Sequence, residues 1–246
     1  MSLYVIADLH LSVAHPDKSM DVFGRRWHDY TEKLNKNWNA VITDEDTVVI
    51  PGDISWGLTL ADALPDFAFI EKLPGKKLIG KGNHDFWWTT AAKTERFFSE
   101  HGMTTMSLLY NNAYAVEDFA ICGTRGWYYD PMGDKIPPET DYQKMTSREA
   151  ARLQLSIDAA NRLCLEDPGK ERLVFLHFPP IWNGQIIPEI VEVLQKNNIK
   201  RVFFGHIHGS YNLPTSFEAD GILYSLISAD FLNFAPRPIF PSSFYG

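Results

Sequence analysis

Five short apolar runs in this chain are each followed directly by side chains that can ligate a metal ion or transfer a proton. The five segments read VIADLH, VVIPGD, LIGKGNHD, LVFLH and FFGHIH, and they contain five of the eight His residues. Carboxylates and imidazoles are costly to bury without a partner. A fold that carries them at the end of every run must therefore bring those ends to a place where something compensates them.

The apolar runs themselves predict strands, because they are short and rich in β-branched or aromatic residues. Seven such strands are expected at residues 3–7, 47–50, 76–80, 119–123, 172–177, 201–205 and 221–227. Helical patterns are expected at residues 25–38, 59–72, 89–101, 147–165 (with Thr146 or Ser147 as N-cap) and 188–198. Strands that alternate with helices indicate a layered α/β fold.

Three segments are less regular. Residues 103–118 predict either a hairpin or a loop. Residues 124–145 contain Gly and several Pro residues and predict a long surface loop, of a length that often serves as a lid. The Pro- and aromatic-rich residues 231–246 favour an extended arm packed on the body over a partner-binding tail.

Length and composition narrow the function. The 246 residues fit one large or two small domains, and we expect a single domain over residues 1–246. The formal charge of −8 and the lack of a basic run argue against a nucleic-acid partner. No apolar run approaches the roughly 18 residues of a membrane span, and the N-terminus does not resemble a signal peptide. Cys122 and Cys164 form no CxxC pattern, and two thiols give no disulfide framework, which favours a cytoplasmic location. A single disulfide between them is left open. The oligomeric state is left open.

Ligands bind outside the carboxyl ends of the strands in an open α/β sheet, so we expect the five polar clusters to form one site. The candidate ligands are Asp8, His10, Asp53, Asn83, His177, His206 and His208. In D-x-H and H-x-H the ligands are two apart, and extended backbone would point both to one side. Seven ligands are more than one tetrahedral zinc ion can bind. They suit two cations that share a carboxylate. The absence of thiolate favours Mn, Fe, Zn, Ni or Co.

The ordered set D-x-H, G-D, G-N-H-D, H and G-H-x-H, from residue 8 to residue 208, resembles the calcineurin-like metallophosphoesterase superfamily. The resemblance implies an α-β-β-α sandwich of two mixed sheets, with a dinuclear centre of Mn, Fe or Zn at the strand ends. It implies that Asp8, His10 and His208 hold one metal, that Asn83, His177 and His206 hold the second, and that Asp53 bridges them. It also implies that His84 is catalytic and that Asp85 orients it.

Departures from the better-known branches narrow the resemblance. The segment GDISWG lacks the Arg that follows the G-D motif in protein Ser/Thr phosphatases, and the third motif ends in Asp85 where those enzymes have Glu. Trp56 stands where purple acid phosphatases have a Tyr ligand. The pattern is closest to bacterial phosphohydrolases and class III cyclic nucleotide phosphodiesterases.

These observations predict a phosphohydrolase that cleaves a small phosphate monoester or diester by direct attack of a metal-bridging hydroxide. One alternative is a nuclease acting on DNA or RNA. The other is a non-catalytic metal-binding scaffold, and the intact ligand set argues against the scaffold. The substrate, the preference for monoester or diester and the native metals are left open. Aromatic residues lie close to the ligands in the sequence and either stack on substrate or pack behind the site. They are Trp56, Phe86, Trp87, Trp88, Trp127 and Trp182. Arg125, next to Trp127, either binds a phosphate oxygen or forms a salt bridge with a surface acid.

Overall fold

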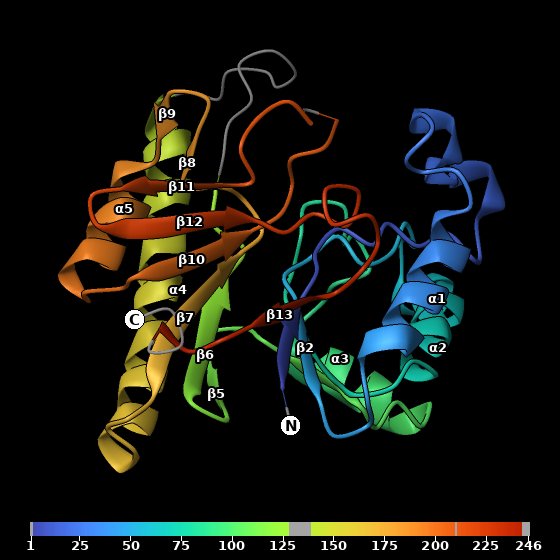
Figure 1. The fold of residues 1–246 in the computed structure, drawn as a ribbon, viewed down its shortest axis with the longest axis horizontal. Helices are drawn as coiled ribbons and strands as arrows, with labels where there is room; N and C mark the ends of the chain where they lie inside the picture. Colours follow the sequence, from blue (N-terminus) through green and yellow to red (C-terminus); the bar gives the residue numbers. More distant parts are fainter. Residues whose placement is uncertain (1, 128–138, 210, 243–246) are drawn as a thin grey trace.

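Two mixed β-sheets lie face to face between two layers of helices (Figure 1). The computed structural model describes residues 2–127, 139–209 and 211–242. The first sheet has the strand order β13-β1-β2-β3-β4, in which only β13 is antiparallel to its neighbour. Its strands are β1 (Leu3–Val5), β2 (Thr47–Ile50), β3 (Lys76–Ile79), β4 (Met106–Leu108) and β13 (Arg237–Ile239).

The second sheet has the order β11-β12-β10-β7-β6-β5, with a parallel centre and an antiparallel strand at each edge. Its strands are β5 (Ala113–Val116), β6 (Phe119–Thr124), β7 (Glu171–Leu176), β10 (Arg201–Phe204), β11 (Ser216–Ala219) and β12 (Ile222–Leu226). A separate hairpin is formed by β8 (Ile181–Trp182) and β9 (Gln185–Ile186).

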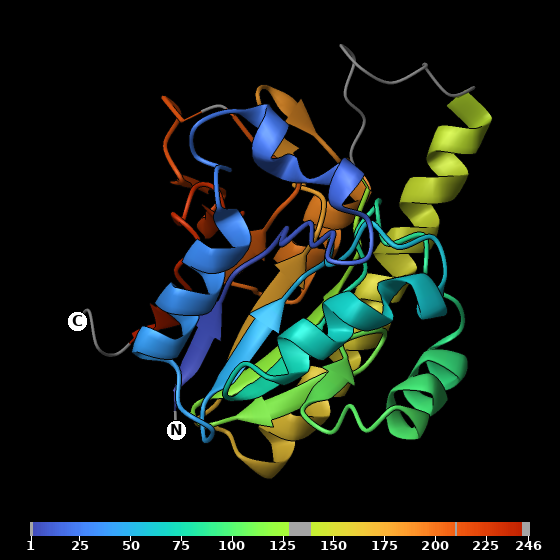
Figure 2. The same cartoon turned by 90° about the vertical axis from the view of Figure 1, so that its right-hand side faces the viewer.

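The helices form the two outer layers. They are α1 (Tyr30–Val41), α2 (Leu60–Glu71), α3 (Ala91–Glu100), α4 (Glu139–Glu166) and α5 (Pro188–Lys196), with short 3₁₀ turns at Pro16–Lys18 and Met20–Phe23. The first three helices cover the first sheet, and α4 and α5 cover the second (Figures 1 and 2). A capping box at Thr59 and Asp62 starts α2.

Strand alternation divides the apolar side chains among three cores. In β2, Val48 and Ile50 face the helices of the first layer, whereas Val49 faces the second sheet. The core between the sheets is completed by side chains of the opposite sheet such as Ile121 and Phe175. Each strand is thus buried on both faces, which explains why the runs read as continuously apolar. The α-β-β-α sandwich is confirmed.

The seven expected strands are confirmed, but the expected loop at residues 124–145 is wrong in part. Helix α4 begins at Glu139, directly after two Pro residues of the sequence, so Thr146 lies inside the helix and does not cap it. The Thr146 hydroxyl instead donates to the Gln143 carbonyl and to Glu189, at 3.2 and 2.9 Å. The rest of the expected loop, residues 128–138, lies outside the described residues. Helix α1 likewise begins at Tyr30, later than the pattern from residue 25 predicts.

Residues 103–118 form neither a hairpin nor a plain loop. They contain β4, an edge strand of the first sheet, and β5, an edge strand of the second, so the segment crosses from one sheet to the other. The expected C-terminal arm contributes β13, which pairs with β1; residues 243–246 lie outside the described part.

Cys122 and Cys164 are both free thiols, so the bridge left open by the sequence is not formed. None of the helices in the described ranges is long and apolar enough to cross a membrane. The cytoplasmic location stays a prediction.

Candidate metal centre

The candidate ligands come from both sheets and meet where the strands end. Asp8 follows β1, Asp53 follows β2 and Asn83 follows β3, all in the first sheet. His177 follows β7, and His206 follows β10, in the second sheet. The bridges Ala7–Ser228 and Leu11–Ser55 tie the loops that carry them. All seven candidate ligands are brought to one place.

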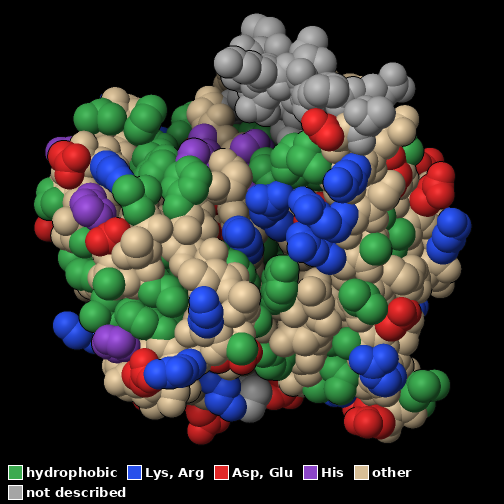
Figure 3. All heavy atoms as spheres, turned by 180° about the vertical axis from the view of Figure 1, so that it is seen from behind, with side chains coloured by type: hydrophobic (Ala, Val, Ile, Leu, Met, Phe, Trp, Pro, Cys, Tyr) green, Lys and Arg blue, Asp and Glu red, His purple; other side chains and the backbone are tan. Residues whose placement is uncertain are grey.

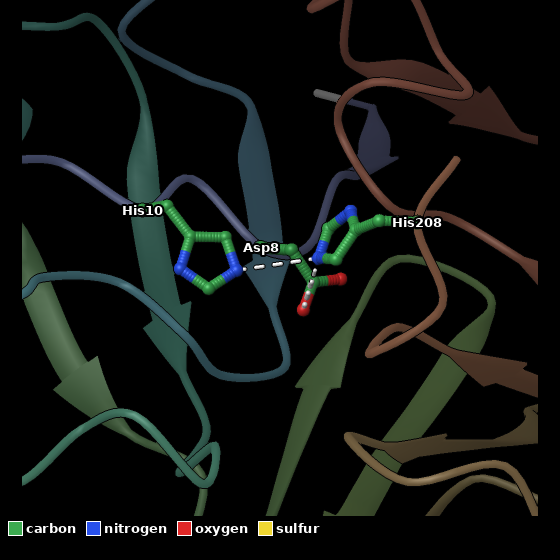
Figure 4. A group of neighbouring side chains, drawn as sticks. All are labelled: Asp8, His10 and His208. Atoms are coloured by element: carbon green, nitrogen blue, oxygen red, sulfur yellow. Dashed lines mark hydrogen bonds and ion pairs between the residues drawn. The ribbon is translucent and has the colours of Figure 1, made fainter. Parts of the chain in front are cut away.

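Asp8, His10 and His208 form a first group of ligand atoms (Figure 4). The Nε2 atoms of His10 and His208 lie 3.2 Å apart. His208 Nε2 also lies 3.8 Å from Asp8 Oδ1. One carboxylate and two imidazoles that face a common point are a donor set suited to Mn, Fe or Zn.

Asn83 is the centre of a second group. Its Oδ1 atom lies 2.6 Å from Nε2 of His177 and 3.1 Å from Nδ1 of His206. The amide oxygen therefore lies next to two imidazole nitrogens that come from the opposite sheet. The structure thus brings together the three residues that the resemblance implies for a second cation.

Asp53 lies between the two groups. Its Oδ2 atom is 3.6 Å from His10 Nε2 and 3.5 Å from His177 Nε2. Asp8 also reaches both sides, since its Oδ1 atom lies 3.6 Å from His177 Nδ1. A carboxylate in the place of Asp53 can serve two cations at once.

The backbone at the ligands is not extended, so the expected reason for the two-residue spacing is wrong. Asp8, His10, Asp53 and His206 have φ angles of 59°, 44°, 52° and 70°. Non-glycine residues adopt this left-handed region at a cost of order 1–3 kcal/mol each. The turns that aim these side chains are local kinks after β1, β2 and β10, which the pattern of residue types does not reveal.

Two glycines are required because a ligand carboxylate lies too close to each of them to leave room for a side chain. A Cβ atom at Gly82 would overlap the carboxylate of Asp53, and one at Gly205 would overlap the carboxylate of Asp8. Each glycine directly precedes a candidate ligand in the sequence, Asn83 and His206 respectively. Their lack of a side chain is what lets the carboxylates enter the site.

Burial sets the charge of the ligands. It raises the pKa of Asp8 to about 6 and raises the pKa of Asp53 well above its usual range, with repulsion from nearby carboxylates adding to the shift at Asp53. Burial also lowers the pKa of His10 and His177 well below the usual value for imidazole. Neutral imidazoles are the form that binds metal, and bound cations would favour the ionised carboxylates. The donor set therefore fits two cations.

His84 lies beside these groups without belonging to them. Its backbone N–H donates to Asp53 Oδ1 at 2.8 Å, and its ring lies 4.5 Å from the Trp56 ring between centroids. The Nδ1 atom is buried and has no hydrogen-bond partner among the described residues. Burial lowers the pKa of this imidazole, and the charge of His208 lowers it further.

The Asp85 carboxylate forms no hydrogen bond with the His84 ring in the described part of the chain, so the contact expected for an orienting role is absent there. This carboxylate is buried and accepts from the backbone N–H of Asp53 and Ile54 at 2.8 Å and of Gly82 at 2.7 Å, and from the Trp87 indole at 2.9 Å. These donors belong to the two loops that carry Asp53 and Asn83. Asp85 thus joins two ligand loops, a role that the resemblance did not imply.

The packing partners of the histidines are aromatic. Trp87 and Trp88 are buried in the helix-facing core, so they pack behind the site. Trp56 is half-buried and stacks on His10, with 5.1 Å between ring centroids. Phe86, by contrast, is 59% exposed. Of the three consecutive aromatic residues Phe86, Trp87 and Trp88, only Phe86 exposes its ring to solvent.

Asp230 was missed by the sequence analysis. It is fully buried in the loop after β12, and its Oδ1 atom lies 2.9 Å from Nδ1 of His208. Its other oxygen accepts from the Tyr211 hydroxyl at 2.8 Å and from the Gly209 N–H at 3.3 Å. Burial lowers the pKa of His208, but the hydrogen bond and charge of Asp230, with Asp8, outweigh it and raise that pKa. A carboxylate on the far nitrogen fixes which nitrogen of His208 faces the site.

Solved structures support the fold. A protein of unknown function, AQ665 from Aquifex aeolicus, matches with a TM-score of 0.50 and 15% identity over 96% of this chain and 95% of its own. TT1561 of Thermus thermophilus matches with a TM-score of 0.54 and 10% identity over 96% and 97%. No significant relative is found among curated proteins.

The sequence model of the calcineurin-like phosphoesterase family matches residues 1–210. That range contains every candidate ligand and His84. With the ligands of two strand-end clusters facing each other across the sheets, the chain belongs to the calcineurin-like phosphoesterase family and is a metal-dependent phosphoesterase.

Proposed function

We propose that this protein hydrolyses a small phosphate monoester or diester at a dinuclear centre of Mn, Fe or Zn. The observation that carries the proposal is the meeting of seven ligand groups from both sheets, with His84 beside them and bonded to Asp53 through its backbone. Two cations held here would supply an activated water molecule and would neutralise charge on the phosphate oxygens.

We propose the ligand assignment in two halves. Asp8, His10 and His208 hold one cation, and Asn83, His177 and His206 hold the other. Asp53 is the shared ligand, which its position between His10 and His177 supports.

His84 is the proposed catalytic residue. Its imidazole is not used by either ligand group, and its lowered pKa keeps it neutral near pH 7 unless a substrate anion stabilises its proton. It would donate a hydrogen bond to the phosphate or to the leaving oxygen. Packing against the tilted Trp56 ring, with 4.5 Å between centroids, supports the position of the His84 ring.

The single-domain assignment over residues 1–246 belongs to the same proposal. The pairing of β13 with β1 supports it, because a strand from the C-terminal part of the sequence lies in the same sheet as the first strand.

The direct test is turnover of p-nitrophenyl phosphate and bis(p-nitrophenyl) phosphate by protein loaded with Mn²⁺. Hydrolysis of either ester supports the proposal, and their ratio gives the monoester or diester preference. Protein that binds two metals and turns over neither ester with Mn, Fe or Zn would sink it.

Asn83→Ala and His84→Ala should separate metal binding from chemistry. Loss of the amide oxygen removes a ligand, so Asn83→Ala should lower the bound metal from two ions toward one. His84→Ala should retain two metals and lose turnover by about 100-fold, the usual effect of removing a proton donor. Elemental analysis of each variant and its rate with p-nitrophenyl phosphate check this. Loss of metal from His84→Ala would contradict the division of roles.

A further inference from the structure

A group of cations lies beside the metal centre, although the chain carries a formal charge of −8. We call it the basic cluster, and it comprises Lys81, Arg125, Arg148 and Arg152. Figure 3 shows Lys and Arg side chains gathered on one face, next to a pair of His side chains. Like charges repel at short range, so their gathering at one place calls for a compensating anion.

The basic cluster is tied to the metal ligands through the backbone. The carbonyl of Arg125 accepts from the N–H of His177 at 3.1 Å and from that of Phe178 at 2.9 Å. Lys81 lies two residues before Asn83, on the same loop after β3. Lys81 therefore lies on a ligand loop of the first sheet, and Arg125 lies on the loop after β6 of the second sheet, hydrogen-bonded to the ligand His177.

The guanidinium of Arg125 is held over aromatic rings, 5.3 Å from the Trp127 centroid and 5.7 Å from that of Phe178. In the described part of the chain it forms no ion pair or side-chain hydrogen bond, and it is half-buried. Stacking on rings fixes the plane of a guanidinium and leaves its N–H groups available for bidentate contact with a phosphate.

The carboxylate within the cluster is already used. Glu149 is fully buried, and its two oxygens accept from Arg152 at 2.5 Å and from the Thr124 hydroxyl at 3.1 Å. Arg152 therefore balances Glu149. Arg125, Lys81 and the exposed Arg148 form no ion pair with a carboxylate in the described part of the chain, so their charges are available to a bound anion.

We propose that the basic cluster binds a second phosphate of the substrate, next to the phosphate at the metal centre. The substrate class is then a small ester with two or more phosphates, such as a diphosphate or a bisphosphate. This proposal rests on the proposed function and names its substrate class. A compact cluster beside a metal site in an acidic chain matches a small polyanion, whereas a nucleic acid requires a basic stripe along the surface.

Binding of two stable phosphonates to Mn²⁺-loaded protein tests the proposal. Methylphosphonate carries one anionic group, and methylenebisphosphonate carries two joined by a bond that the enzyme cannot hydrolyse. Calorimetry should show wild-type protein binding the bisphosphonate about 10-fold or more tightly than methylphosphonate. The metal content after each titration shows that the bisphosphonate has not removed the metal.

Arg125→Ala and Arg148→Ala should reduce this preference to about three-fold or less, mainly through weaker binding of the bisphosphonate. Arg162→Ala is the matched control, because Arg162 is exposed on α4 about 21 Å further along the helix from Arg148. It should keep the wild-type preference. Arg148 is exposed, so Arg148→Ala and Arg148→Glu carry the test if Arg125→Ala fails to fold.

Three results overturn the proposal. They are equal affinity of wild-type protein for the two phosphonates, equal weakening of both by the Arg variants, and tighter binding of a single-stranded oligonucleotide than of the bisphosphonate. Wild-type protein that hydrolyses p-nitrophenyl phosphate but shows no bisphosphonate preference contradicts only this inference. Protein that hydrolyses no single-phosphate ester contradicts the proposed function itself.

Discussion

At the scale of single residues, Asp85 differs most from its expected role. The family resemblance implies an acid that orients His84, yet the carboxylate accepts from backbone N–H groups of two ligand loops and from Trp87. Hydrogen bonds to an ionised group contribute more than neutral ones, and a buried donor left without an acceptor is costly. Asp85 therefore stabilises the site by fixing backbone, and reaches His84 only through the loops.

Asp85→Asn should lower the free energy of unfolding of metal-free protein by about 3 kcal/mol, because an amide cannot accept from all of these donors. Urea unfolding of the chelator-treated protein measures it. Asp118→Asn, at an exposed turn, should have little effect. A stable Asp85→Asn protein whose only defect is in turnover would restore the orienting role.

At the scale of elements, strands and strand ends followed from the sequence, whereas loop conformations did not. Runs such as TVVI are buried on both faces, so composition alone marks them. The left-handed turns at Asp8 and His206 depend on what packs around them, and residue type gives no sign of them. Asp230 could have been found, because it lies three residues after the expected strand at 221–227, where the same strand-end reasoning applies.

The contact between Asp230, in the loop after β12, and His208 leads to a prediction about metal binding. Asp230→Asn removes the charge that holds Nδ1 of His208, so affinity for one cation should fall by about 10- to 100-fold. Competition with a metal-binding dye measures the two dissociation constants. The control is Asp220→Asn, an exposed carboxylate nearby in sequence that should leave both constants unchanged. If both dissociation constants of Asp230→Asn equalled those of the wild-type protein, the proposed effect of Asp230 on metal binding would be contradicted.

At the scale of the whole molecule, one buried cation sets part of the pH dependence of stability. Lys77 in β3 is fully buried, and its ammonium group donates to the Leu73 carbonyl and to Thr105 Oγ1. Burial lowers its pKa to about 8. The unfolded chain keeps this proton to a higher pH, so the folded state is penalised below about pH 8 and the penalty is relieved as the pH rises.

The free energy of unfolding should therefore rise from pH 8 to pH 10 by up to about 1 kcal/mol per pH unit through Lys77. Lys77→Met should lose this rise, whatever its absolute stability. Urea unfolding at several pH values, compared between wild-type protein and the variant, isolates the contribution of Lys77 from other titrating groups. If the free energies of unfolding of the two proteins changed in parallel with pH, a contribution from Lys77 would be excluded.

The origin of the ligands has a consequence for the lifetime of the protein. Asp8, Asp53 and Asn83 belong to loops of the first sheet, and His177 and His206 to loops of the second. Bound cations would cross-link the two halves of the sandwich at one end, where the sheets otherwise adhere through their apolar faces. Starved of metal, the halves would separate more often at that end and expose their edges to proteases, so the supply of metal would govern how long each molecule persists as well as how fast it works.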